Sequence, residues 1–405
     1  MGVREKGVGI VAETDIEEGT LLWTEKPLYS SIARQLPDGE YSDLACEACG
    51  SYCGTLQLQL KLFGGSVSYT EACKTLASGE DSEIKELMKK PALPGVSEVD
   101  CILTDGAPLV LAVGDGHVVF CGQSCRKGWE DANKSLLKDG KLQKVRQIMV
   151  DEDLEYLGLA AALKNGAEAS AGAGLDALCG DKYHKCIDRD GHEELSDEEW
   201  EKECMRPCEK LAGVMGMAPS EVSEIMGKLC RNSIMVTFTS PVFEYLAGVS
   251  GLKNKDTPEF ADLMSLVRPV ASKSKSTNKE PDSASESESE PEAKLELADG
   301  VVLTDKDVPP YAGWAVYPLL SAVNHACKPN LDTEFLQGDS TLSVLAKRKI
   351  LKGQELTICY ADPDDDQPER QAALRSYGFV CGCDLCGQEL RAIAGPPAKK
   401  ARARA

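Results

Sequence analysis

Long apolar runs, a signal peptide and a dense cysteine framework are all missing from this sequence of 405 residues. No stretch approaches eighteen uninterrupted apolar residues, which excludes an ordinary membrane-spanning helix. The opening letters MGVREKGVGIVAETD place charges where a signal peptide needs an apolar core. Seventeen cysteines are too few for a secreted disulfide scaffold, and the odd number fits such a framework poorly. We therefore expect a soluble, intracellular protein whose cysteines bind metal.

Basic residues are also scarce relative to acidic ones. The chain has 45 Lys and Arg against 66 Asp and Glu, which gives a net charge of −21. This balance argues against direct nucleic-acid binding and favours basic partners such as Lys-rich peptides. The apolar fraction of 42% and the charged fraction of 27% are typical of globular proteins. Most of the chain is therefore expected to fold, as one large domain or two to three smaller ones.

Local patterns predict strands near both ends of the chain and helices between them. Apolar and β-branched runs predict strands at 8–12, 21–23, 234–238, 342–346 and 356–358. Helix signals comprise a run at 81–90, an N-cap at Asp151 with a stop at 165–166, a capping box of Ser196 and Glu199, and a cap at Ser220. Residues 271–294, ASKSKSTNKEPDSASESESEPEAK, predict a disordered loop, because little apolar surface is present to offset the entropy of ordering.

The strongest local signal is a group of three closely spaced cysteines, Cys381, Cys383 and Cys386. Tetrahedral zinc needs four ligands, and such a knuckle takes its fourth from elsewhere in the chain. Cys327 is the leading candidate, because Pro329 and the neighbouring asparagines predict an irregular loop that can approach a second segment. The alternative is three buried free thiols, which without a metal would be prone to oxidation.

Three blocks of sequence resemble, in order and spacing, the segments shared by SET-domain protein lysine methyltransferases. They are NHACKPN at 324–330, GQELTICY at 353–360 and YGFVCGCDLC at 377–386. The opening KGVGIVA at 6–12 and the segment GWAVYP at 313–318 are similar to the SET and MYND branch of that family. The resemblance covers residues 1–45 and 230–386 well. It implies an α+β fold of small β-sheets with a helical insertion, in which the Asn-His segment and the Tyr360 segment meet as a pseudoknot.

The resemblance also implies a methyl-transfer site. Transfer from S-adenosylmethionine to a lysine amine is an in-line displacement, so the protein must align the donor with a neutral amine, and no metal is needed for that step. By resemblance, Tyr360 orients the lysine nitrogen and Tyr377 forms part of the same channel wall. The implied cofactor contacts come from the backbone at Lys6, Gly7 and Gly9, the Asn324 side chain, the His325 backbone and the stacking ring of Phe379.

A second set of cysteines lies where SET and MYND proteins insert a cross-braced two-zinc finger. The pairs that share one metal in that family are kept as Cys46, Cys49, Cys121 and Cys125. At the spacing of the family's last ligands the chain has Asn133 and Leu137, so the second site has lost two ligands. Three cysteines remain that could rebuild it: Cys53, Cys73 and Cys101. We predict a degenerate MYND-like finger with one zinc, held across a gap of 67 residues between Cys53 and Cys121.

Two further groups carry less specific signals. The cysteines and histidine at Cys186, His192, Cys204 and Cys208 follow no zinc-site spacing, and we interpret them as core residues. The basic tail resembles a short nuclear-import signal, with Lys399, Lys400, Arg402 and Arg404. Nucleus and cytoplasm both remain open, with the nucleus slightly favoured. Only nineteen residues follow Cys386, so we expect none of the long helical C-terminal domain found in better-known SET and MYND proteins.

These features divide the chain into seven expected segments. They are an N-terminal SET portion at 1–45, the MYND-like zinc finger with its long insertion at 46–137, a helical insertion at 138–250, a flexible acidic Ser/Glu loop at 251–300, the SET core at 301–362, a post-SET zinc knuckle at 363–386 and a basic tail at 387–405.

The sequence thus predicts S-adenosylmethionine-dependent methylation of a lysine side chain in a protein, either a histone or a ribosomal or other non-histone protein. No direct contact with nucleic acid or membrane is expected. The alternative is a catalytically inactive, zinc-containing SET-like scaffold that binds partner peptides. Retention of Asn324, Tyr360 and Phe379 favours the enzyme, whereas the short start, six residues before Gly7, favours the scaffold. Cofactor binding distinguishes the two hypotheses.

Overall fold

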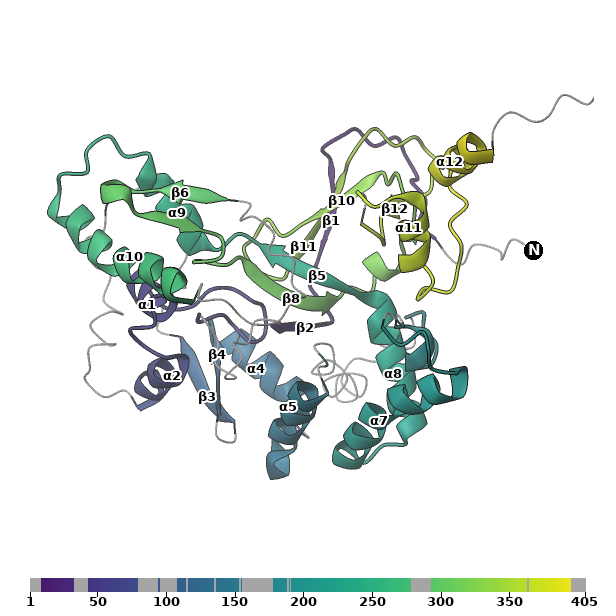
Figure 1. Cartoon of the computed structure of the whole chain (residues 1–405), viewed down its shortest axis with the longest axis horizontal. Helices are drawn as coiled ribbons and strands as arrows, with labels where there is room; N and C mark the ends of the chain where they lie inside the picture. The colour runs from purple at the N-terminus through teal and green to yellow at the C-terminus, as the bar shows by residue number, and fades with distance from the viewer. Residues whose placement is uncertain are drawn as a thin grey trace, which may run out of the picture.

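Two small antiparallel sheets lie at the centre of the molecule in the computed structural model, and helices surround them (Figure 1). The structure describes residues 9–32, 43–78, 94, 108–113, 116–134, 136–152, 154, 178–187, 189, 191–277, 293–362 and 364–394. The predicted helix at 81–90 and the predicted helix stop at 165–166 lie outside these residues. Short sheets mixed with helices confirm the predicted α+β class.

The first sheet joins the start of the chain to its last third. It contains β1 (Leu21–Glu25), β11 (Leu342–Ala346) and β10 (Leu331–Glu334), in that order. The strands predicted at 21–23 and 342–346 are therefore confirmed. Strand β11 is the central strand, since it pairs with both β1 and β10. Nearly all of its side chains are buried, as expected of a strand that is covered on both faces.

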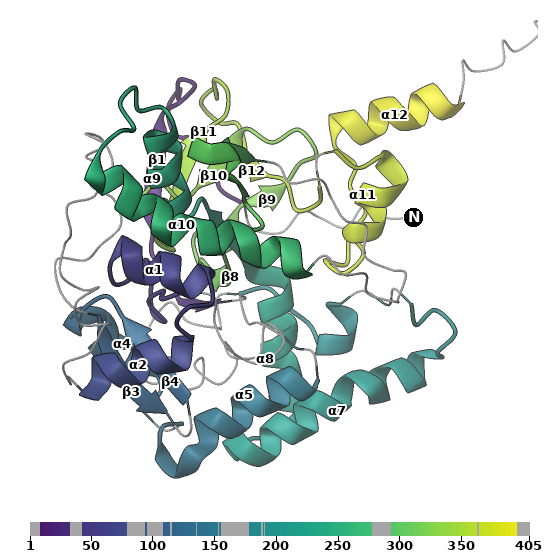
Figure 2. The ribbon, with the colours of Figure 1, turned by 60° about the vertical axis from the view of Figure 1, so that its left-hand side comes forward.

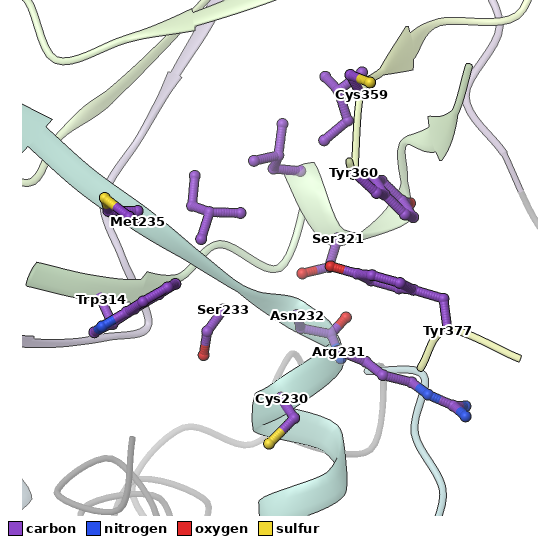
Figure 3. Close-up of a pocket in the computed structure, with 13 residues that line it drawn as sticks. Cys230, Arg231, Asn232, Ser233, Met235, Trp314, Ser321, Cys359, Tyr360 and Tyr377 are labelled. Atoms are coloured by element: carbon purple, nitrogen blue, oxygen red, sulfur yellow. The ribbon is translucent and has the colours of Figure 1, made fainter. Parts of the chain in front are cut away.

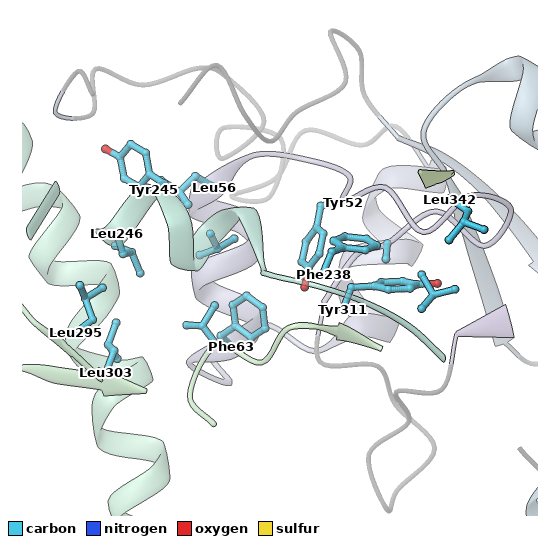
Figure 4. Close-up of a cluster of buried hydrophobic side chains, with 14 of the residues drawn as sticks. Tyr52, Leu56, Phe63, Phe238, Tyr245, Leu246, Leu295, Leu303, Tyr311 and Leu342 are labelled. Carbon is cyan, nitrogen blue, oxygen red and sulfur yellow. The ribbon is translucent and has the colours of Figure 1, made fainter. Parts of the chain in front are cut away.

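The second sheet positions the helical insertion against the rest of the chain. Its order is β2 (Tyr29–Ile32), β8 (Tyr311–Val316) and β5 (Ser233–Phe238), all antiparallel. Phe238 of β5 stacks on Tyr311 of β8 with ring centroids 4.6 Å apart, within a buried cluster that also holds Tyr52 and Leu342 (Figure 4). Because β5 pairs with β8 alone, it forms one edge of this sheet within the described residues.

The Asn-His segment and the Tyr360 segment meet, as the sequence predicts. Strand β9 (Asn324–His325) pairs in parallel with β12 (Thr357–Ile358). The Asn330 side chain locks the two segments, since its amide donates to the Glu355 carbonyl at 2.8 Å and its oxygen accepts from the Thr357 N–H at 2.9 Å. Asn330 is buried, so these bonds satisfy a polar group that would otherwise be costly to bury.

Two hairpins and ten helices complete the described elements, with the helices arranged in groups around the sheets (Figure 2). The hairpins are β3 (Leu109–Val113) with β4 (Gly116–Phe120), and β6 (Lys294–Glu296) with β7 (Val302–Thr304). The helices are α1 (Leu56–Phe63), α2 (Tyr69–Ser78), α4 (Gln123–Ala132), α5 (Lys141–Asp151), α7 (Asp197–Met215), α8 (Pro219–Asn232), α9 (Pro241–Ser250), α10 (Pro258–Thr277), α11 (Gln367–Ala373) and α12 (Asp384–Ala394). None of the helices within the described part of the chain has the length and apolarity needed to cross a bilayer.

Some predicted helix boundaries are confirmed and others are wrong. Ser196 and Glu199 form the predicted capping box of α7. Helix α8 begins at Pro219, with Ala218 rather than Ser220 as its N-cap residue, because proline already has a helical φ angle and suits the first turn. Asp151 ends α5 instead of beginning a helix.

Two other local predictions also need correction. Helix α10 continues to Thr277, into the segment 271–294 that was predicted to be disordered. Val270 and Ala271 are buried in the core, so the apolar face of the helix extends past the start of the polar run. The predicted strand at 8–12 is reduced to one isolated bridge between Val11 and Glu355, and Val8 lies outside the described residues.

Candidate active site and cysteine clusters

The C-terminal cluster consists of Cys327, Cys381, Cys383 and Cys386, whose sulfur atoms all lie within 4.8 Å of one another. The Cys327 sulfur is 3.5 Å from that of Cys386 and 3.8 Å from that of Cys381. Tetrahedral zinc with Zn–S bonds of about 2.3 Å separates its sulfur atoms by about 3.8 Å. The structure therefore brings the distant Cys327 to the knuckle, as predicted, and this cluster could hold zinc.

Helix α11 supports the C-terminal cluster through two side chains that the sequence analysis missed. The Gln371 amide donates to the Cys381 carbonyl at 3.1 Å and to the Cys386 sulfur at 3.4 Å, while its oxygen accepts from the Cys381 N–H at 3.0 Å. Arg370 is buried, pairs with Glu389 at 2.6 Å, and its positive charge interacts with Cys327. A buried cation beside four sulfurs offsets the negative charge that metal-bound thiolates bring.

The N-terminal cluster consists of Cys46, Cys49, Cys121 and Cys125, again within 4.8 Å of one another. The Cys121 sulfur lies 3.6 Å from that of Cys49 and 3.5 Å from that of Cys125. Hydrogen bonds among the four thiols lower the pKa of Cys49 and Cys125 and raise the pKa of Cys46 and Cys121, so the four groups titrate as one coupled set. Cys121 follows β4 and Cys125 lies in the first turn of α4, so the hairpin and helix present the second pair of ligands.

The N-terminal cluster is fixed against the central sheets by backbone contacts. The Ser340 N–H, in the β10–β11 connection, donates to the Cys49 carbonyl at 2.7 Å. Gly50 has a φ angle of +79°, and a Cβ atom there would lie 2.8 Å from the Tyr311 ring. Only glycine fits this left-handed position against the ring. Glu47 adds an ion pair with Arg146 of α5 at 2.5 Å.

The positions that depart from the family's zinc spacing have structural contacts. Asn133 is buried, and its amide donates to the Trp129 carbonyl at the end of α4, while Leu137 packs against the same core. Cys53 and Cys73 are buried but belong to neither four-cysteine group, and Cys101 lies outside the described residues.

The third set of candidate ligands is not assembled within the part of the chain that the structure describes. Cys186, Cys204 and Cys208 are buried in the core, and the metal-ligand groups include none of them. The Cys208 sulfur donates to the Cys204 carbonyl and approaches the Met226 sulfur at 3.5 Å. The imidazole of His192 lies against Trp200 with centroids 5.5 Å apart.

Four aromatic rings gather beside the C-terminal cluster. Tyr360 lies 4.8 Å from Tyr377, 5.4 Å from His325 and 6.5 Å from Phe379, measured between ring centroids. His325 is 6.0 Å from Phe379. All four rings come from the Asn-His, Tyr360 and Tyr377 blocks, which are three separate segments of the sequence. The two candidate catalytic residues and two of the candidate cofactor residues therefore share one site.

The His325 ring connects the Tyr360 segment to the C-terminal cluster. The Tyr360 N–H donates to Nδ1 of His325 at 3.0 Å, so the imidazole proton is on Nε2, which lies 3.3 Å from the Cys327 sulfur and can donate to it. Burial, with Arg370 nearby, lowers the pKa of His325 to about 4, so the ring is neutral at physiological pH. The sequence analysis assigned His325 a role for its backbone alone, and no local signal marks this side-chain role.

The two tyrosines remain protonated in this environment. Burial raises the pKa of Tyr360 to about 12, and burial also raises the pKa of Tyr377. The Tyr360 hydroxyl donates to the Val323 carbonyl, which directly precedes β9. Tyr360 can therefore act as a hydrogen-bonding and orienting group at neutral pH, whereas a role as a phenolate base is disfavoured.

Asn324 lies between β12 and the opening segment of the chain. Its amide donates to the Glu355 carboxylate at 2.8 Å. A Cβ atom at Gly9 would lie 2.6 Å from the Asn324 amide nitrogen and 2.8 Å from the same carboxylate. Gly9 therefore allows the opening segment to approach Asn324 closely. The structure brings Gly9 and Asn324 together, while Lys6 and Gly7 lie outside the described residues.

A cavity of about 370 Å³ runs from the two tyrosines along the start of β5. Figure 3 shows Tyr360 and Tyr377 at one end and Met235 and Trp314 at the other. Asn232, at the end of α8, lies close to the tyrosine end. A cavity of this size suits a small molecule or a single side chain with its flanking backbone.

Comparison with known proteins agrees with this geometry. The family model of the SET domain matches residues 7–361. The chain is 39% identical over 83 residues to histone-lysine N-methyltransferase ATXR2 of Arabidopsis thaliana, and 41% identical over 76 residues to histone-lysine N-methyltransferase SET5 of Eremothecium gossypii. It is 36% identical over 85 residues to protein-lysine N-methyltransferase SMYD4 of Homo sapiens. These matches cover 18 to 20% of this chain and 18%, 15% and 10% of the three relatives respectively.

Proposed function

Because the chain belongs to the SET domain family, we propose that it transfers a methyl group from S-adenosylmethionine to a lysine side chain of a protein substrate. The observation that carries this proposal is that two candidate binding places adjoin the same pair of strands, β9 and β12. Gly9 closely approaches the Asn324 side chain of β9, and the cavity of Tyr360 and Tyr377 is lined in part by Ile358 of β12. A donor and an acceptor bound at these two places would meet beside Val323 and Tyr360.

The cofactor side fits the residues that are present. Asn324 and the His325 backbone lie at the strand pairing, where they can hold the polar amino-acid end of S-adenosylmethionine, and Phe379 offers a ring face for the adenine. Lys6 and Gly7 are proposed to extend this contact along the backbone. When bound, the cofactor supplies a methyl group activated by its positively charged sulfur.

The lysine side of the site is suited to a neutral amine. The pKa values of Tyr360 and Tyr377 are raised, so both side chains stay uncharged. The Val323 carbonyl adds a hydrogen-bond acceptor. A charged ammonium would lose hydration in this cavity, and among the described residues that line it there is no carboxylate to compensate. The nitrogen lone pair must also be free for attack on the methyl carbon.

Both four-cysteine clusters are proposed to hold structural zinc, because four thiolates without an open position form closed sites. The proposed substrate is a histone or a ribosomal or other non-histone protein. This is supported by the relatives, which are named histone-lysine and protein-lysine methyltransferases, and by the excess of acidic residues. A nuclear location, with the cytoplasm as the alternative, rests on the basic tail alone.

Methyl transfer to basic proteins tests this function. The zinc-loaded protein is incubated with S-adenosylmethionine labelled in the methyl group and with mixed histones or ribosomal proteins. We expect label on lysine side chains, and we expect a Tyr360→Phe variant of the same fold and zinc content to lose nearly all of it. A well-folded, zinc-loaded protein that neither binds the cofactor nor transfers label would contradict the proposal and support the inactive scaffold.

A further inference from the structure

The cavity that begins at the two tyrosines ends on an apolar surface of the second sheet. Met235 of β5 and Trp314 of β8 are directly opposite each other in the antiparallel register. Residues that face each other in this way have Cβ atoms about 5 Å apart on one face of the sheet. Met235 is 57% exposed, and Trp314 is half-buried beside it. We call this pair the Met235–Trp314 surface.

None of the described residues that line this end of the cavity is charged. Arg231 is the one charged residue among the described residues that line the cavity, and its Nε donates to the Ser376 carbonyl at 3.0 Å. Figure 3 shows its guanidinium pointing away from Met235 and Trp314. A lysine or arginine of a substrate placed here would meet no carboxylate among the described lining residues, although the whole chain carries a net charge of −21. Within the described part of the chain, the excess of acidic residues therefore does not extend into the cavity lining.

The distance from the tyrosine end indicates which substrate residue would reach this surface. Asn232 lies at the tyrosine end, and Met235 is three residues further along the extended strand β5. At about 3.3 Å per residue this spans about 10 Å, which an extended substrate segment covers in two or three residues. A side chain two or three positions from the target lysine would thus contact Met235 and Trp314.

We propose that the Met235–Trp314 surface binds an uncharged apolar side chain of the protein substrate, two or three residues from the methylated lysine. This inference rests on the proposed methyltransferase function and makes it more specific. The cavity is continuous from Tyr360 and Tyr377 to this surface, so the occupant is the same polypeptide that presents the lysine. The surface selects substrates that have an apolar residue near the target lysine, whereas the net charge of the chain alone predicts a basic residue there.

Synthetic peptides with one fixed target lysine test the inference. Each peptide has fifteen residues in a Gly/Ser background, and one position within three residues of the target lysine holds Leu, Ser, Lys or Glu. In the Lys peptide, fragment mass spectrometry distinguishes the two lysines, and only transfer to the target lysine is counted. Methyl transfer is measured as kcat/KM with labelled S-adenosylmethionine. Partial burial of a leucine side chain predicts roughly a tenfold higher kcat/KM for Leu than for Ser at one position, and a larger factor over Lys or Glu. Fluorescence anisotropy of labelled Leu and Lys peptides measures binding independently of catalysis, and we expect the Leu peptide to bind more tightly than the Lys peptide.

Two variants assign the effect to this surface. Met235→Glu should remove the preference for Leu and favour Lys at the same position, because it places a carboxylate opposite Trp314. Leu336→Glu is the matched control, since Leu336 is 60% exposed and does not line the cavity, and it should leave the preference unchanged. Equal turnover of all peptides, or a preference for Lys in the unmodified chain, overturns the inference while the proposed function stands. Failure to methylate any peptide or basic protein overturns both.

Discussion

Each of the two clusters consists of four cysteines, but the surroundings of the two clusters differ. The N-terminal cluster packs against a large core that includes helices α7 and α8, and it is tied to the central sheets through Ser340 and Tyr311. The C-terminal cluster has a core of four buried residues, three of which are its own cysteines. The fourth cysteine, Cys383, is partly buried, and so are the neighbours of the cluster, Tyr360, Tyr377, Phe379 and Leu385. One cluster therefore stabilises the fold, while the other organises the site.

The largest expected difference concerns loss of a ligand from each cluster. Cys381→Ser should abolish detectable cofactor binding, because without zinc little apolar burial remains to order Tyr377 and Phe379. Cys121→Ser should lower the free energy of unfolding by about 3 kcal/mol or more, yet leave cofactor affinity within about threefold at temperatures where the variant is folded. Zinc content, calorimetric titration with S-adenosylmethionine and urea denaturation measure these effects. Equal loss of cofactor binding in both variants would remove the distinction between the clusters.

Tyr360→Phe should reduce catalysis without disturbing either cluster. The substitution removes the hydroxyl that donates to the Val323 carbonyl and retains the ring that packs against His325 and Tyr377. Removal of one such orienting group typically costs about 100-fold to 1000-fold in kcat. Single-turnover kinetics with labelled cofactor measure the effect, with cofactor affinity and zinc content as controls. A kcat within threefold of that of the unmodified protein would show that Tyr360 acts elsewhere.

Outer contacts of the clusters provide a milder comparison. His325→Leu removes the imidazole that connects the Tyr360 N–H to the Cys327 sulfur through hydrogen bonds. The variant should have a zinc affinity at the C-terminal cluster, or a methyltransferase activity, that is about 10-fold to 100-fold lower. Ser51→Ala removes the hydroxyl 3.2 Å from the Cys49 sulfur and should leave activity unchanged. Zinc affinity from competition with a chelator, measured for each cluster, separates the two cases. Normal zinc affinity and activity in His325→Leu would show that the hydrogen bonds of the His325 ring support neither the cluster nor the site.

Two glycines give the smallest expected effects. Gly50→Ala places a Cβ against the Tyr311 ring at a positive φ angle, and should destabilise the fold by about 1 to 3 kcal/mol without changing cofactor affinity. Gly9→Ala crowds the Asn324 amide and should weaken cofactor binding by about tenfold with little change in stability. Thermal unfolding and calorimetric titration of both variants measure the pair. If Gly9→Ala lowered stability without weakening cofactor binding, and Gly50→Ala weakened cofactor binding instead, the assignment of the opening segment to the cofactor site would be contradicted.

Spacing within the sequence predicted the parts of the site that local geometry determines. Three cysteines within six residues indicate a zinc knuckle. The capping box at Ser196 was predictable for the same reason, since it depends on residues three apart. The meeting of the Asn-His and Tyr360 segments joins distant parts of the chain, and it was predicted from the resemblance to SET-domain proteins.

Other features depend on approaches between distant segments. The roles of Gln371 and Arg370 follow from the packing of α11 against the cysteines, and that of the His325 ring follows from its register opposite Ile358. Helix α10 reaches Thr277 because its buried face finds partners in the core, which composition alone does not reveal. Predictions of this kind require tertiary contacts that override local propensity.

Calorimetric titration of the zinc-loaded protein with S-adenosylmethionine, beside an Asn324→Ala control, tests the proposed activity most directly. The account predicts saturable binding with one site per chain, which the control loses while its zinc content and thermal unfolding stay close to those of the unmodified protein. Absence of binding by a folded protein that retains zinc in both clusters would contradict the methyltransferase assignment. The cysteine clusters would then belong to a scaffold without this enzymatic function.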